Sequence, residues 1–199
     1  MRFSLVLLLP ACAYAQHATL PPPITSAERV HWVINSTVGP ASLWGGLFSA
    51  GFGTLLDAPH EYGTHWDGAA KRYGMRLTGV ATSNVMEAGI GSLWGEDPRY
   101  VKAASGSSFG HRVGHIAKWT FVAANRDGDP HPAYARFIAI AGSNALSNTW
   151  RADSEADTTH FVARTALGVA LRMAGNTWEE FWPDAKRKLF HRDAKSGTP

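Results

Sequence analysis

Small residues recur at every fourth position within the uncharged stretch from Val38 to Leu56. On a helix this spacing places them on one face and keeps large side chains off it, so another backbone can approach closely. Three series of this period occur in the chain: Ala41, Gly45, Ser49 and Gly53; Ala135, Ala139, Ser143 and Ser147; and Ala166, Ala170 and Ala174. We therefore expect helices that pack against one another along glycine- and alanine-lined faces.

Helical periodicity extends over most of the chain, and no run of alternating β-branched residues indicates a strand. Thr25 and Glu28 have the spacing of a capping box in front of the first helix. The expected helices cover residues 26–38, 40–56, 69–94 (continuous, or broken once near Gly79), 111–124, 133–150 and 156–174, followed by a segment that starts at Asn176 or Thr177 and is interrupted at Pro183 before residues 184–192. These patterns predict an all-α fold, a single compact domain of six or seven helices over residues 25–192.

The N-terminus has the features of a secretory signal peptide. Arg2 precedes an apolar stretch, and Ala13-Tyr14-Ala15 has the small-residue pattern of a cleavage site. We expect residues 1–15 to be removed and the protein to be exported, either to the periplasm or to a membrane-associated position in the cell envelope. The alternative is cleavage before Cys12 and lipidation of that residue, because Leu9-Pro10-Ala11-Cys12 loosely resembles a lipoprotein box.

The ends of the exported chain are expected to lie outside the helical domain. Residues 16–24 contain Leu20-Pro21-Pro22-Pro23, which favours a stiff, extended spacer, and residues 193–199 are expected to form a disordered tail. Cys12 is the only cysteine, so a mature chain that begins after Ala15 has none. Disulfides, cysteine-ligated zinc and thiol catalysis are then excluded.

Positive charge gathers near the C-terminus of a chain whose net charge is +3. The basic residues follow a group of aromatic ones, in the order Trp178, Phe181, Trp182, Lys186, Arg187, Lys188 and Arg192. Aromatic rings beside a basic cluster suit the surface of an anionic membrane, so an expected contact involves Trp178, Trp182, Lys186, Arg187 and Lys188. The alternative is that the aromatic residues belong to the core. A protein that packs on the small-residue helices is the other expected partner, and export argues against nucleic acid.

The stretch from Val38 to Leu56 is just long enough to cross a bilayer. Its glycine and serine content, and a mean hydropathy of −0.16 for the chain, argue against a span. Whether this stretch spans or is buried stays open at this point.

Five side chains are candidates for a metal or hydrolytic site: His60, His65, Glu87, His111 and His115. His111 and His115 are four positions apart and share one face of a helix, but the glutamate of a zincin motif is missing. Glu87 is the single acid in a series of small residues, and burial there would require an ion pair, which we expect, or protonation. His60 and His65 are five apart, so only a loop could bring them together. No cofactor is expected, and a divalent metal is the alternative.

Three segments resemble those of a family of exported, small-residue-rich helical proteins of soil bacteria: residues 95–100, 142–150 and 180–188. The resemblance covers most of the chain after the proline-rich spacer, and it implies no reaction, cofactor or catalytic residue. The sequence also contains no nucleophile elbow, P-loop or dinucleotide fingerprint. We therefore expect a non-enzymatic cell-envelope protein with a structural or interaction role. The alternative is an envelope hydrolase that uses a metal or a histidine–carboxylate site.

Overall fold

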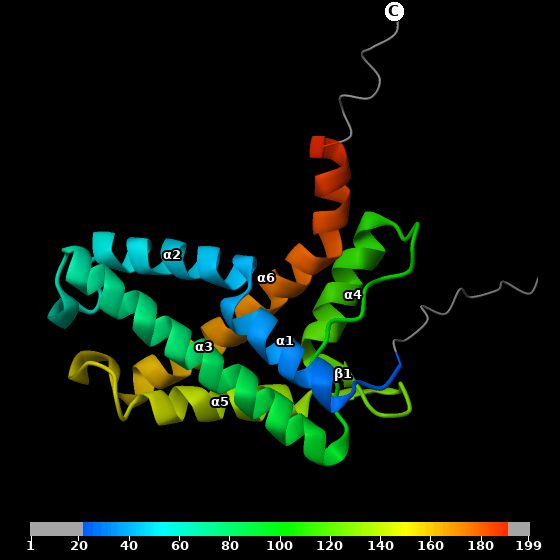
Figure 1. Ribbon diagram of the computed structural model, residues 1–199, viewed down its shortest axis with the longest axis horizontal. Coiled ribbons are helices and arrows are strands. Elements are labelled where there is room, and N and C mark those ends of the chain that lie inside the picture. Colours follow the sequence, from blue (N-terminus) through cyan, green and yellow to red (C-terminus); the bar gives the residue numbers. More distant parts are fainter. Residues whose placement is uncertain (1–21, 191–199) are drawn as a thin grey trace, which may run out of the picture.

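The computed structural model describes residues 22–190 (Figure 1). The expected signal peptide, Cys12, the first part of the proline-rich spacer and the tail at 193–199 lie outside the described residues. The described chain contains six α-helices: α1 (Ser26–Val38), α2 (Pro40–Leu55), α3 (Trp66–Trp94), α4 (Phe109–Phe121), α5 (Tyr134–Ser147) and α6 (Thr158–Phe190). Two 3-10 turns, η1 (His60–Tyr62) and η2 (Asp153–Glu155), and an antiparallel pair of short strands, β1 (Val122–Ala124) and β2 (Pro130–Pro132), complete it.

The long helix α3 organises the fold, because α1, α2 and α5 all pack against it. Helix α6 packs against α4 and α5. Helix α2 lies on the outside of the molecule, and its main contacts are with α3 and α1 (Figure 1). The described residues form one mostly helical domain, in agreement with the all-α prediction.

The first helix begins where the sequence predicts. The Thr25 hydroxyl accepts a hydrogen bond from the backbone N–H of Glu28 at 3.2 Å, and the Glu28 carboxylate accepts one from the backbone N–H of Thr25 at 2.7 Å. This reciprocal pair is a complete capping box. Pro40 occupies the first turn of α2, where its missing N–H leaves no helical bond unmade.

The small-residue series differ in where they lie. All four members of the second series, Ala135, Ala139, Ser143 and Ser147, are buried in α5. In α6 the third series is exposed, so it forms no buried face: Ala166, Ala170 and Ala174. A period of four places residues on one face, but it does not determine whether that face meets another helix or solvent.

Two strands occupy positions that the sequence did not predict as strand. Residues 122–124, expected to be helical, leave α4 and pair with residues 130–132, with Ala123 opposite His131. In the turn between them, the Asn125 side chain accepts hydrogen bonds from the backbone N–H groups of Asp127 and Asp129. Strands of three residues are too short to show alternation, which is why the pattern missed them.

Helix α6 is continuous through both positions where the sequence predicted an interruption. Asn176 does not cap a new helix, because its side chain is buried and donates a hydrogen bond to the Thr120 hydroxyl at 3.2 Å. Pro183 lies inside α6, where it cannot donate to the carbonyl one turn back. The last part of α6 runs in a different direction from the rest (Figure 1), as a proline in a helix favours.

The interior is built largely from charged and small residues. The largest fully buried side chains are Arg136, Glu96, Thr120, Pro98 and Ser147, and most buried apolar residues are alanines. One compact apolar cluster consists of Val101, Trp119 and Ala124. Many large apolar side chains are exposed, whereas several charged ones are buried, which is the reverse of the usual distribution in globular proteins.

Candidate interaction surface

Helix α2 turns one row of small residues toward the protein and most of its large ones outward. The buried positions of this 16-residue helix are Gly46 and Ala50. Five of its large side chains are among the most exposed in the described chain: Trp44 (71%), Phe48 (80%), Leu55 (84%), Phe52 (56%) and Leu47 (54%). We refer to these five residues as the α2 face. No residue of α2 carries a charge, so the α2 face has no charged border on its own helix.

Close approach to α3 explains the small residues on the inner side. A Cβ atom added at Gly46 would lie 2.7 Å from a ring carbon of Tyr73 and 3.0 Å from a guanidinium nitrogen of Arg76. At Gly53 it would lie 3.1 Å from the Ala58 carbonyl oxygen. Such distances are shorter than ordinary carbon contacts, so these glycines allow α2 to lie against α3.

The contact row is not the series that the sequence analysis singled out. Ala41, Gly45 and Ser49 are exposed, and Gly53 alone of that series is half-buried against α3. The neighbouring row Ser42, Gly46 and Ala50 has the same period and lies opposite the large side chains. Since a helix rotates by about 100° per residue, a change of one position moves the contact from one row to the next.

Arg72 of α3 holds the C-terminal end of α2 in place. Its side chain is buried and donates hydrogen bonds to the carbonyl oxygens of Ala58 (2.8 Å), Pro59 (2.8 Å) and Gly63 (2.6 Å). These carbonyls belong to the connection between α2 and α3, so one guanidinium fixes the whole turn. The α2 face is therefore displayed on an ordered hairpin.

The end of α6 carries the second exposed group. The indole rings of Trp178 and Trp182 stack with centroids 4.5 Å apart, and both side chains are exposed, so they are not core residues. Phe181 points differently: its ring lies 5.6 Å from that of Phe109 and beneath the guanidinium of Arg112. The aromatic residues of this helix thus divide into an exposed tryptophan pair and a phenylalanine that packs against α4.

Arg112 anchors this end of α6 to α4. Its guanidinium lies 2.7 Å from the Glu180 carboxylate and also pairs with Asp184. Glu180 accepts two further hydrogen bonds, from the Tyr100 hydroxyl at 3.0 Å and from the Ala103 N–H at 3.1 Å. Burial opposes ionisation of Glu180, but these hydrogen bonds lower its pKa below the ordinary value. Burial and the same carboxylate raise the pKa of Tyr100.

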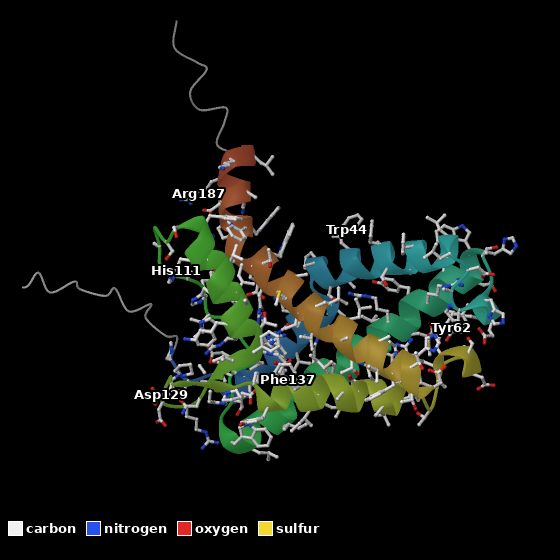
Figure 2. All side chains as sticks on the ribbon, turned by 180° about the vertical axis from the view of Figure 1, so that it is seen from behind. Trp44, Tyr62, His111, Asp129, Phe137 and Arg187 are labelled. Atoms are coloured by element: carbon white, nitrogen blue, oxygen red, sulfur yellow. The ribbon has the colours of Figure 1, made fainter. Side chains whose placement is uncertain are left out.

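The α2 face and the end of α6 project toward the same side of the molecule. In Figure 2, Trp44 points away from the body on the side toward which the last turns of α6, with Arg187, extend. Lys186, Arg187 and Lys188 are exposed there. An uncharged apolar face and a basic helix end thus share one side.

Glu87, which the sequence singled out, is held in the ion pair that we expected. Its carboxylate lies 3.1 Å from Arg136 and 2.8 Å from Arg172, which come from α5 and α6. Arg136 also donates to the carbonyl oxygens of Trp119, Thr120 and Val122, at the end of α4. Burial, reinforced by the positive charge of Arg172, lowers the pKa of Arg136 to about 10. Both arginines contact the same oxygen of Glu87, Oε1, and four helices therefore meet at one buried cluster of charges.

Glu96 has a comparable structural role at the end of α3. Its carboxylate accepts hydrogen bonds from the Trp94 indole at 3.1 Å and from the Ala135 N–H at 3.0 Å, so it caps the N-terminus of α5. The next acid, Asp97, pairs with Arg99 at 2.7 Å. The segment 95–100 thus has a structural role, because it follows the end of α3 and caps the start of α5.

The histidine candidates do not converge. His111 and His115 share a face of α4 with ring centroids 6.3 Å apart, and the Nε2 atom of His115 lies 2.7 Å from the Val101 carbonyl oxygen. His60 is the first residue of η1 and His65 precedes α3, near Tyr62 at the opposite end of the molecule from His111 (Figure 2). Within residues 22–190 no group of three or more histidines, cysteines and acids is arranged to hold a metal ion.

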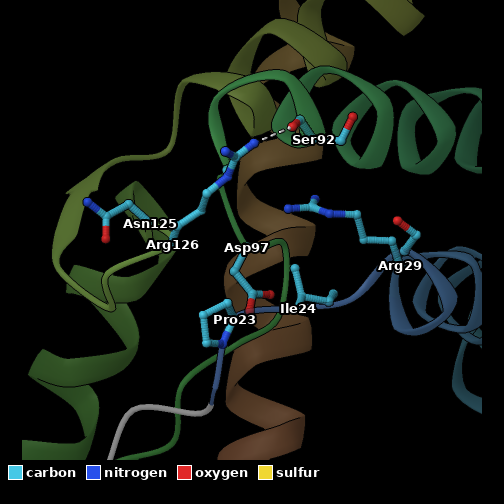
Figure 3. A pocket seen from close by; sticks show the side chains of 9 residues that line it. Pro23, Ile24, Arg29, Ser92, Asp97, Asn125 and Arg126 are labelled. Carbon is cyan, nitrogen blue, oxygen red and sulfur yellow. Dashed lines mark hydrogen bonds between the residues drawn. The ribbon is translucent and has the colours of Figure 1, made fainter.

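A pocket of about 200 Å³ lies between the start of α1, the end of α3 and the loop after β1 (Figure 3). Its charged lining residues are Arg29, Asp97 and Arg126, and each already has a structural partner. Arg29 donates to the Glu96 carbonyl oxygen at 2.7 Å, and Arg126 donates to that of Ser92 at 3.2 Å. The polar groups of this pocket therefore connect segments of the chain to one another.

Sequence reasoning missed the arginines that organise the molecule: Arg72, Arg112, Arg136 and Arg172. No local pattern marks them, because their partners are far away in the chain, and Glu87 is 85 positions from Arg172.

The chain matches no family model, no curated protein and no solved structure. Among residues 22–190 no helix combines the length and apolar character that a membrane crossing needs.

Proposed function

We propose that this protein is a non-enzymatic, exported cell-envelope protein with an interaction role, and that the α2 face is the surface by which it contacts its partner. The single observation that carries the proposal is the inverted orientation of α2. An ordinary surface helix buries its large apolar residues, whereas α2 buries Gly46 and Ala50 and exposes Phe48 and Leu55. Contiguous apolar patches of this kind mark interaction sites. The N-terminal sequence pattern supports the proposed export.

The packing of α2 on α3 supports a role for close helix contacts in this function. Gly46 and Gly53 let the two helices approach, while the Arg72 hydrogen bonds secure the turn between them. A rigid hairpin loses little conformational entropy when its outer face binds a partner.

The hydrolase alternative finds less support in the geometry. A hydrolytic centre needs an acid or base beside a nucleophile or metal in a cavity. Glu87 is neutralised by two arginines, and the two histidine pairs lie at opposite ends of the molecule. Stoichiometric zinc binding that is lost in both His111→Ala and His115→Ala, but kept in His131→Ala, would favour the hydrolase instead.

Cell fractionation tests the proposal. Bacteria that produce the full chain are lysed and separated into a soluble and an envelope fraction. We expect the protein in the envelope fraction and the double variant Phe48→Gln/Leu55→Gln in the soluble one. The matched control Val85→Gln/Leu93→Gln changes two exposed apolar residues of α3 and should stay with the envelope. A folded α2 variant that remains with the envelope would refute the assignment of the α2 face.

A further inference from the structure

We propose that the partner of the α2 face is the surface of an anionic lipid bilayer, with α2 lying in the plane of the membrane and the basic end of α6 against the lipid headgroups. This inference rests on the proposed function and names its partner. It is carried by the chemistry of the α2 face, by the length of α2 and by the charge on the same side of the molecule.

The side chains of α2 are arranged as in helices that meet lipid. Without a hydrophobic driving force between helices, lipid-exposed proteins place small residues at helix contacts and apolar residues outward. Gly46 faces Tyr73 and Arg76 of α3, whereas Trp44, Phe48 and Leu55 point away from the protein.

The length of α2 favours a position in the interface over a crossing. Sixteen residues of helix extend about 24 Å, which is shorter than the hydrocarbon core of about 30 Å. The hairpin partner α3 carries Lys71, Arg72 and Arg76, so the two helices cannot enter the hydrocarbon together. If only the apolar face of α2 enters the headgroup boundary, its length is sufficient and the charges of α3 stay outside the hydrocarbon.

Charge identifies the type of lipid. From Asp184 to the C-terminus the sequence has five lysines and arginines and two aspartates. The exposed Trp178 and Trp182 precede them, and indole rings favour the headgroup level of a membrane. Because Trp44 and Arg187 project toward the same side, one approach brings both groups to an anionic surface.

The same charge argues against a second copy of the chain as the occupant. A two-fold contact places the same patch on both subunits. Paired α2 faces would turn the exposed Lys186, Arg187 and Lys188 toward a second chain of the same positive net charge. A negatively charged lipid surface complements these cations, and a second copy does not.

Vesicle sedimentation with the purified protein tests the inference. The probe is a vesicle of equal parts phosphatidylcholine and phosphatidylglycerol, and vesicles of phosphatidylcholine alone are the neutral comparison. We expect binding to the anionic vesicles that is at least tenfold stronger, and that weakens as salt rises from about 0.1 M to about 1 M and shortens the screening length.

Two matched pairs of variants locate the contact. Leu55→Gln should weaken binding by roughly tenfold, because the leucine no longer enters the membrane, while Leu93→Gln, at an equally exposed position in the last turn of α3, should leave it unchanged. Lys186→Gln/Lys188→Gln should weaken binding by roughly thirtyfold. The control Lys118→Gln/Arg126→Gln removes the same charge from the end of α4 and the loop after β1, and it should leave vesicle binding nearly unchanged.

The outcomes are distinct. Equal effects of Leu55→Gln and Leu93→Gln would overturn the inference, and so would binding that ignores lipid charge. A dimer in sedimentation equilibrium that Leu55→Gln dissociates would also overturn it and would make a second copy the occupant. If the α2 variants leave the envelope fraction in cells but the purified protein ignores vesicles, the proposed function stands and the lipid assignment fails.

Discussion

Two glycines of α2 provide a sharp test of which side of this helix meets the protein. Gly46→Ala and Gly51→Ala make the same change in the same helix. A Cβ atom at position 46 would lie 2.7 Å from the Tyr73 ring and 3.0 Å from an Arg76 nitrogen, whereas position 51 has nothing within 4 Å. The two variants therefore share their gain in helix propensity and differ in packing.

The magnitudes separate the two variants clearly. Alanine in place of glycine stabilises an exposed helix position by about 1 kcal/mol, so Gly51→Ala should raise the free energy of unfolding by that amount. At Gly46 the same gain is opposed by an overpacking cost of about 1 to 3 kcal/mol. Displacement of Arg76 would also weaken its 3.1 Å hydrogen bond to the Ser42 carbonyl oxygen, at a cost of about 1 kcal/mol. We expect Gly46→Ala to be less stable than Gly51→Ala by about 2 kcal/mol or more.

Urea unfolding followed by circular dichroism measures this difference, and both variants should keep the slope of the wild-type transition. In thermal melts the expected separation is about 4 to 8 °C for a chain of this size. Equal stabilisation by both substitutions would show that the Gly46 side of α2 is open. The orientation of α2 described above would then be wrong.

Three further predictions concern the buried charges and the cap. Arg136→Met should lower the free energy of unfolding by about 3 to 5 kcal/mol in urea melts, because Glu87 then keeps one cation and three carbonyls lose their donor; a loss below 1 kcal/mol would contradict the role of this cluster. Since the folded pKa of Glu180 is lowered, its contribution to stability is present above the ordinary value of 4.5 and disappears as the pH falls through the folded value. Arg112→Met should therefore lower the free energy of unfolding more at neutral pH than in acid. If the Arg112–Glu180 ion pair were unimportant, unfolding curves would show the same loss at both pH values. Thr25→Ala should cost about 1 kcal/mol and increase amide exchange in the first turn of α1, and unchanged exchange there would argue against the capping box.

Local signals in the sequence were sufficient for the early helices. The capping box at Thr25 and the proline at position 40 act within one turn, so they predict where α1 and α2 begin regardless of the rest of the fold. Asn176 shows the limit of such signals. Its preference for a helix start is overridden by a buried hydrogen bond to Thr120, which a single sequence does not reveal.

The surface of α2 was only half predictable. The sequence shows both the small residues and the large ones, and it shows that they lie on different faces. Two neighbouring rows of small residues, one with Gly45 and one with Gly46, fit the pattern equally well, and only the position of Tyr73 and Arg76 on α3 selects between them. The signal that was overlooked is that the contact row lies opposite Phe48.

Hydroxyl-radical footprinting of the purified protein, with and without anionic vesicles, tests the central claim most directly, because it reads the exposure of the α2 face without any substitution. We expect Trp44 and Phe48 to be oxidised rapidly in the free protein, in keeping with their exposure of 71% and 80%, and to be protected when vesicles are added. Tyr134, which is 58% exposed at the start of α5, should stay reactive in both states. Slow oxidation of Trp44 and Phe48 in the free protein, or equal oxidation with and without vesicles, would contradict the account.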